Sequence, residues 1–136
     1  MNKMDISFEV NKKSDFVFKY LTNMDLFSSV HPVISKIDHI KKNEYLVHET
    51  LKFCWVPISF TYPVTITENR FDNVIIIDAI IMGIVKMNMT FKIEGRKDST
   101  IVYEKMVLKS ILPVKSLIKS IVKKQHTKLF ENINAK

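Results

Sequence analysis

The chain has 136 residues, of which 46% are hydrophobic and 26% are charged, and its formal net charge is +7. This composition excludes a disordered chain and is typical of a globular protein, here expected as a single domain over residues 1–136. The single cysteine, Cys54, excludes an internal disulfide and a thiolate metal cluster, and it fits a reducing, cytoplasmic setting.

The positive charge is concentrated near the end of the sequence. From Pro113 onward there are six lysines and one acidic residue, Glu131. We expect either a solvated helix face or a peripheral contact with an anionic membrane surface. Nucleic acid is not expected as a partner, because Arg70 and Arg96 are the only arginines and no basic patch is interleaved with exposed aromatic residues.

The first quarter of the chain predicts a strand and two short helices. Met4 to Val10 alternates apolar and polar residues, as a half-buried strand does. Ser14 is expected to cap a helix that Asn23 ends. A second helix, from Asp25 to about Val30, is expected to stop before His31-Pro32, because proline disfavours the helical conformation in the residue before it.

Six strands are expected next, and their short turns predict an antiparallel meander. They cover residues 33–40, 44–53, 58–67, 74–81, 86–94 and 100–108. Pro63 interrupts the polar face of the third of them and indicates a sheet edge or a bulge there.

The chain closes with the only long predicted helix, from Pro113 to about Asn134. Its apolar stripe follows the 3–4 spacing of one helical face and consists of Val114, Leu117, Ile118, Ile121, Val122, Gln125, Leu129 and Ile133. Pro113 suits the first helical turn. Gln125 either bonds to nearby backbone or faces a cavity, and the turns beyond it are expected to be wetter.

This order of elements resembles the START/Bet v 1-like (SRPBCC) superfamily, and more narrowly the bacterial polyketide cyclase/dehydrase-type lipid-binding proteins. The residues that carry the resemblance are Ile6-Ser7-Phe8-Glu9-Val10, followed by Ser14-Asp15-Phe16-Val17-Phe18, and the segment from Phe27 to Val33. It implies an α+β helix-grip fold, β-α-α-β6-α, in which a curved antiparallel sheet of about seven strands surrounds the C-terminal helix.

The resemblance also implies a cavity between sheet and helix for a hydrophobic or amphipathic, lipid-like molecule. The inward-facing candidates are Tyr45, Val47, Phe53, Phe60, Tyr62, Met87, Met89, Phe91, Ile118, Ile121, Val122 and Gln125. The same residues can instead fill a solid core. We expect the cavity between Val114 and Gln125.

Three functions stay open. The first is a carrier without catalysis. The second is a small cyclase, dehydratase or hydrolase that uses Glu49, Tyr62 or Tyr103. Glu49 either faces the cavity or pairs across the sheet, whereas Asp78 and Glu104 are expected to face solvent or pair with a lysine.

The third function is an interaction module, monomeric or homodimeric, that uses two unusually apolar turns. These turns, 54–57 and 81–85, otherwise mark a cavity entrance or membrane contact, or fold over the core. No metal site is expected, because the four histidines lack ligand spacing. No cofactor is expected either, because the phosphate-binding glycine motifs are missing from the sequence.

Overall fold

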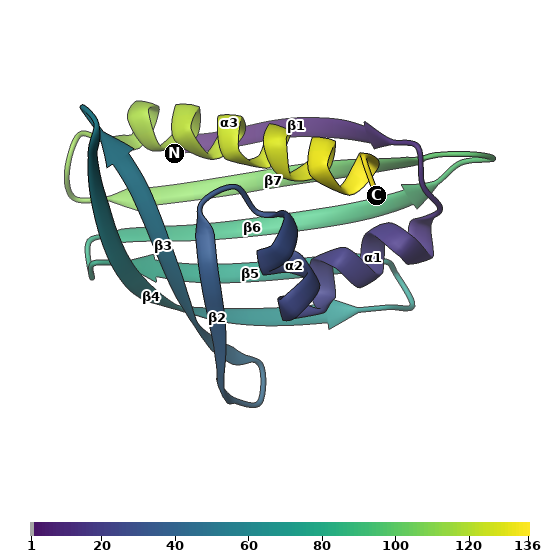
Figure 1. The fold of residues 1–136 in the computed structure, drawn as a ribbon, viewed down its shortest axis with the longest axis horizontal. Coiled ribbons are helices and arrows are strands. Elements are labelled where there is room, and N and C mark those ends of the chain that lie inside the picture. Colours follow the sequence, from purple (N-terminus) through teal and green to yellow (C-terminus); the bar gives the residue numbers. More distant parts are fainter. Residues whose placement is uncertain (1) are drawn as a thin grey trace.

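The computed structural model describes residues 2–136, except for the side chains of Asn2 and Phe53. Seven strands and three helices occur in the predicted order β-α-α-β6-α (Figure 1). They are β1 (Asn2–Val10), α1 (Ser14–Thr22), α2 (Met24–Val30), β2 (Ile34–Lys41), β3 (Glu44–Phe53), β4 (Val56–Asn69), β5 (Val74–Ile81), β6 (Val85–Gly95), β7 (Thr100–Ser110) and α3 (Lys115–Asn134). The helix-grip fold expected from the sequence is confirmed.

The strands form one antiparallel sheet in the order β1-β7-β6-β5-β4-β3-β2. From β2 to β7 every strand pairs with its neighbour in sequence, because each connection is a short turn. β1 pairs with β7, the last strand, and so brings the two ends of the chain together. The sheet curls strongly, so that β2 and β3 cross in front of the long strands β5 and β6 (Figure 1).

The long helix α3 lies across the concave side of the sheet, against β1 and β7. The rings of Phe8 on β1 and Phe130 on α3 stack with their centroids 4.4 Å apart. Asn132 donates from Nδ2 to the carbonyl oxygen of Val30 at 2.8 Å, which joins α3 to α2. The C-terminal half of α3 is therefore anchored on both sides.

Two expected helix starts are wrong. α1 begins at Ser14 itself, with Lys13 at the N-cap position, and α3 begins at Lys115, after Val114; neither helix has a side-chain cap. Pro113 thus precedes the helix. Asn23 has the capping role that the sequence assigned to Ser14, because its Oδ1 accepts the backbone N–H groups of the next helix.

Pro63 lies where β4 changes from an edge strand into an inner strand. It is opposite Leu46 of β3, whereas pairing of β4 with β5 begins one residue later, at Val64 and Ala79. The first part of β4 therefore has only one neighbouring strand. A residue without an N–H is tolerated at such an edge, as the sequence indicated.

The expectation that the last turns of α3 are wetter is wrong. His126, Leu129, Phe130 and Ile133 are all buried, whereas Leu117 near the start of the helix is 52% exposed. Leu129 and Ile133 were assigned to the stripe, but His126 and Phe130 were not. These two side chains complete a packed face against β1, β6 and β7.

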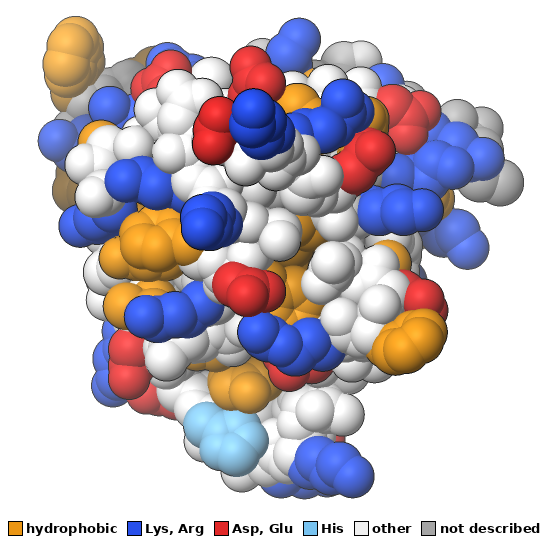
Figure 2. All heavy atoms as spheres, turned by 90° about the vertical axis from the view of Figure 1, so that its right-hand side faces the viewer, with side chains coloured by type: hydrophobic (Ala, Val, Ile, Leu, Met, Phe, Trp, Pro, Cys, Tyr) orange, Lys and Arg blue, Asp and Glu red, His pale blue; other side chains and the backbone are white. Residues whose placement is uncertain are grey.

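One end of the sheet carries the β4–β5 and β6–β7 turns. Figure 2 shows this end: basic and acidic side chains are interspersed there, and hydrophobic side chains form separate areas between them. The opposite end of the sheet carries the apolar turns and leads into the cavity.

Candidate ligand cavity

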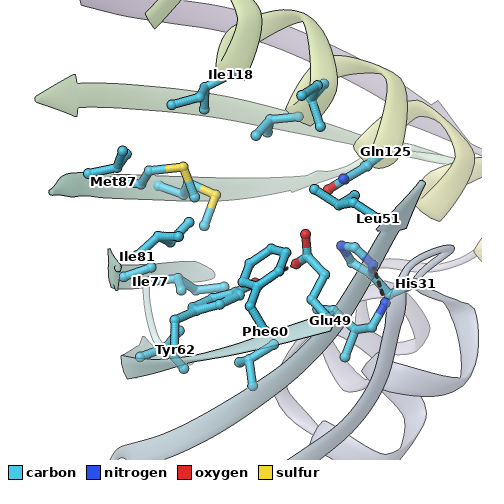
Figure 3. A pocket seen from close by; sticks show the side chains of 18 of the residues that line it. His31, Glu49, Leu51, Phe60, Tyr62, Ile77, Ile81, Met87, Ile118 and Gln125 are labelled. Carbon is cyan, nitrogen blue, oxygen red and sulfur yellow. Dashed lines mark hydrogen bonds between the residues drawn. The ribbon is translucent and has the colours of Figure 1, made fainter. Parts of the chain in front are cut away.

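A cavity of about 300 Å³ lies between the concave face of the sheet and the N-terminal half of α3. Strands β2 to β6, helix α2 and helix α3 all contribute side chains to its wall, and nearly all of these are hydrocarbon or thioether groups (Figure 3). The cavity exists because α3 packs closely on β1 and β7 only through its second half. Its first half spans the open part of the curled sheet.

Most of the residues expected to face inward do line this cavity. They are Val47, Phe60, Tyr62, Met87, Met89, Ile118, Ile121, Val122 and Gln125. Tyr45 and Phe91 do not line it. Tyr45 is half-buried near the β2–β3 turn, where its ring lies 5.0 Å from that of His39. Phe91 is buried beside His126 and Phe130, in the packed region. The side chain of Phe53 lies outside the described part of the structure.

The wall also contains residues that the sequence reasoning missed. Met24, Phe27 and His31 come from α2 and the segment that follows it, and His126 comes from α3. The short α2 gave no signal of its position over the sheet. His126 could have been found, because it follows Val122 by four residues on the apolar stripe.

Glu49 and Tyr62 form a buried hydrogen-bonded pair in the cavity wall. The Tyr62 hydroxyl donates to Oε1 of Glu49 at 2.7 Å, from the neighbouring strand. Burial raises the pKa of the Glu49 carboxyl, and Tyr62, His126 and Gln125 offset part of this rise. Burial, together with the Glu49 carboxylate, raises the pKa of Tyr62 well above its ordinary value. Of the two interpretations of Glu49, the structure shows the inward one.

His31 has one nitrogen engaged by the backbone. Its Nδ1 accepts the N–H groups of Val33 and Ile34, both at 3.3 Å, so the ring proton is on Nε2. Burial, with a smaller contribution from the charge of His126, lowers the pKa of His31 to about 3. The imidazole is therefore a neutral donor at physiological pH.

Glu104 does not face solvent, so that expectation is wrong. It is 2% exposed, and Nδ1 of His126 lies 2.8 and 2.7 Å from its two carboxylate oxygens. The partner is 22 residues away in sequence and on a helix, so the strand pattern could not reveal it. Asp78, in contrast, is exposed and accepts from Asn88 at 2.7 Å.

Tyr103 is not part of the cavity, which corrects its candidacy as a catalytic residue. It is 42% exposed on the outer face of β7, between the inward-facing Val102 and Glu104. Side chains alternate along a strand, so a residue adjacent to two buried ones points away from them. Of the three catalytic candidates, only Glu49 and Tyr62 share a site.

Large exposed apolar side chains surround the cavity mouth, where the β3–β4 turn, the β5–β6 turn and the start of α3 meet (Figure 1). Ile58, Met82 and Leu117 line the cavity and are also exposed. Trp55 in the β3–β4 turn is 93% exposed, and Ile111 before α3 is 83% exposed. We call these five residues the apolar rim.

A second, more open groove runs along the outer side of α3 and shares four wall residues with the cavity, among them Leu51 and Gln125. Its outer wall carries four lysines: Lys52, Lys123, Lys124 and Lys128. The mouth of the cavity therefore combines apolar side chains with a basic border.

Within residues 2–136, no group of three or more histidine, cysteine or acidic residues is arranged to hold a metal ion. No helix in the same range is long and apolar enough to cross a membrane.

Together, the grip of the sheet on α3 and the cavity beneath the helix define a START-type protein. Solved structures share its fold at low sequence identity. A conserved protein from Geobacillus kaustophilus matches with a TM-score of 0.81 and 10% identity, over 98% of this chain and 93% of that one. A START superfamily protein from Mycobacterium smegmatis matches with a TM-score of 0.80 and 13% identity, over 98% and 94%. The Zhui aromatase/cyclase from a Streptomyces species matches with a TM-score of 0.71 and 10% identity, over 98% and 92%.

The chain belongs to the carbon monoxide dehydrogenase CoxG family, whose model matches residues 7–136. This family is part of the SRPBCC group, so the resemblance inferred from the sequence is confirmed. A search of curated proteins found no match.

Proposed function

We propose that this protein binds and carries a hydrophobic or amphipathic small molecule in the cavity between its sheet and α3, without catalysis of its own. The observation that carries the proposal is the apolar space of about 300 Å³, which lies at the lower end of the range for ligand pockets. The START-like fold supports it, since this fold is consistent with a hydrophobic ligand cavity.

The energetics of packing also favour an occupant. A void in a core loses van der Waals contacts and lowers stability by an amount that grows with its volume. The wall includes small side chains such as Ala79 and Val64, and Met87 and Met89, whose flexible thioethers adapt to ligands of different shape. A ligand would supply the contacts that the protein itself lacks there.

The apolar rim and its basic border support entry of the ligand from an anionic membrane surface or from a protein partner. Apolar side chains exposed around a pocket are typical of such contacts, and lysines add attraction to anionic lipid headgroups. We place this activity in the cytoplasm, because Cys54 is a free thiol, and in a single domain that acts as a monomer or a homodimer.

Native mass spectrometry of gently purified protein tests the proposal. We expect an adduct of lipid-like mass that organic extraction removes, and binding of the neutral fluorophore 1-aminoanthracene by the extracted protein. Neither adduct nor fluorophore binding would overturn the proposal.

A small cyclase, dehydratase or hydrolase is the second candidate, favoured by one observation. The Glu49 carboxyl, whose pKa burial raises, and the Tyr62 hydroxyl meet inside the cavity, which is the arrangement of a general acid–base pair. Glu49→Gln should then abolish turnover of a cavity-bound substrate and leave the fold intact. Unchanged turnover would remove Glu49 from this role.

A further inference from the structure

The polar groups of the cavity are gathered at one end. Its wall contains five polar side chains, His31, Glu49, Tyr62, Gln125 and His126, and the remaining wall residues are apolar. In Figure 3, His31, Glu49 and Gln125 converge at one end of the cavity, whereas Ile81 and Met87 lie toward the other. The rings of His31 and His126 are 6.2 Å apart. We call these five residues the polar end.

The hydrogen bonds within the polar end leave specific capacities open. Nδ1 of His31 is occupied by two backbone N–H groups, so Nε2–H is the donor that this residue can offer. Tyr62 occupies one oxygen of Glu49, and a carboxylate can accept about four hydrogen bonds. The polar end therefore offers both a neutral donor and a carboxylate acceptor.

Charge narrows the class of ligand head that fits. A charged head loses its hydration in an apolar enclosure, and an anionic head would also face the Glu49 carboxylate. A hydroxyl group is uncharged, and it can donate to Glu49 and accept from His31 at the same time. An ether or an ester oxygen can only accept.

We propose that the cavity selects molecules with an uncharged hydroxyl head, an alcohol or a phenol, which binds between Glu49 and His31 while its apolar body lies toward Met87. This inference rests on the proposed function and specifies the ligand class of the same site. It also predicts the orientation of the ligand, with the head deep in the cavity and the tail toward the apolar rim.

Displacement of 1-aminoanthracene from extracted protein tests the inference with four ten-carbon competitors: decanol, decyl methyl ether, decanoic acid and decylamine. We expect decanol to bind at least roughly tenfold more tightly than the ether, because only the alcohol donates a hydrogen bond to the buried acid. The acid and the amine should bind more weakly than decanol.

Two variants locate the head. The double variant Glu49→Met/Tyr62→Phe removes both members of the hydrogen-bonded pair, so that no polar partner is stranded, and it should lose the preference for decanol over the ether. His31→Asn removes the Nε2–H donor and should lower the affinity for both competitors. Met89→Leu, which alters only the apolar wall, is the matched control and should change both affinities equally. Thermal unfolding of each variant checks that it is folded.

The outcomes separate the two levels of the proposal. Equal affinity for decanol and the ether would overturn the hydroxyl selection while the carrier function stands. Tighter binding of decanoic acid, lost in Lys123→Ser/Lys124→Ser, would also overturn it and would place the head in the basic groove. If 1-aminoanthracene and all four competitors fail to bind, the carrier function itself fails.

Discussion

Nδ1 of His126 lies within 2.8 Å of both carboxylate oxygens of Glu104, in a contact that is almost completely buried between α3 and β7. The contact is an ion pair when the imidazole is protonated and a hydrogen bond when it is neutral. It lies at the boundary between the two halves of α3, since His126 also lines the cavity and Phe130 one turn later packs on β1. We infer that this pair fixes the height of α3 above the sheet and thereby the size of the cavity.

Glu104→Gln should lower the free energy of unfolding by about 2–4 kcal/mol at neutral pH, because removal of one member of a buried pair leaves the other without its partner. Chemical denaturation of the purified protein measures this value. The exposed carboxylate Asp78 is the matched control, and Asp78→Asn should change stability by about 0.5 kcal/mol or less.

Replacement of both members should restore much of the loss. Glu104→Leu/His126→Leu substitutes packed hydrocarbon for the pair, and such exchanges are often close to neutral. If the double variant is as unstable as the sum of the two single ones, the two residues act independently and the pair does not secure α3.

His31 should make the protein sensitive to acid. Its pKa is about 3 in the folded protein and near 6.5 when unfolded, so the unfolded state binds more protons between these two values. Stability therefore falls as the pH falls through this window. From pH 6.5 to pH 4 the loss attributable to His31 should be roughly 3 kcal/mol.

The variant His31→Asn isolates this effect. An asparagine at this position can accept the same two backbone N–H groups, as Asn23 does for Asp25 and Leu26. Denaturation curves at several pH values should show a shallower decline for the variant than for the wild type. Parallel declines would contradict a buried neutral His31.

The cavity predicts an unusual tolerance for a larger side chain. Ala79 on β5 is 2% exposed and lines the cavity, so Ala79→Leu should fit into empty space and change stability by less than about 1 kcal/mol, in either direction. It should also weaken the binding of 1-aminoanthracene. Val102→Leu, at a fully buried position outside the cavity wall, is the control and should cost about 1–3 kcal/mol. Equal losses in the two variants would indicate that the space is filled.

The β3–β4 turn should be strained for the sake of its exposed side chains. Cys54 and Trp55 both have positive φ values, 49° and 71°, a conformation that suits Asn-Gly and is costly for bulky residues. Cys54→Asn/Trp55→Gly should therefore raise stability by about 1–2 kcal/mol. It should also reduce sedimentation with vesicles of anionic phospholipid.

A control for the vesicle experiment lies at the other end of the sheet. Phe71 in the β4–β5 turn is 96% exposed, so Phe71→Ser removes a similar apolar surface far from the cavity mouth. It should leave vesicle binding unchanged. A loss of binding in both variants would show that general hydrophobicity, and not the apolar rim, causes the association.

The sequence by itself determined the order of the elements and which strand residues face inward. The two-residue period along β4, β6 and β7 identifies the buried side of each strand, and short turns allow only an antiparallel meander. The same period places Tyr103 on the outer face, beside the inward-facing Glu104.

Only the tertiary structure decided which inward-facing positions are packed and which line a cavity. Met89 and Phe91 are both buried on β6, yet only Met89 lines the cavity, because α3 packs on the sheet beyond Phe91 and not before it. The partner of Glu104 was hidden for the same reason. A pattern along one element reports the direction of a side chain, whereas contacts depend on where a second element, distant in sequence, crosses the first.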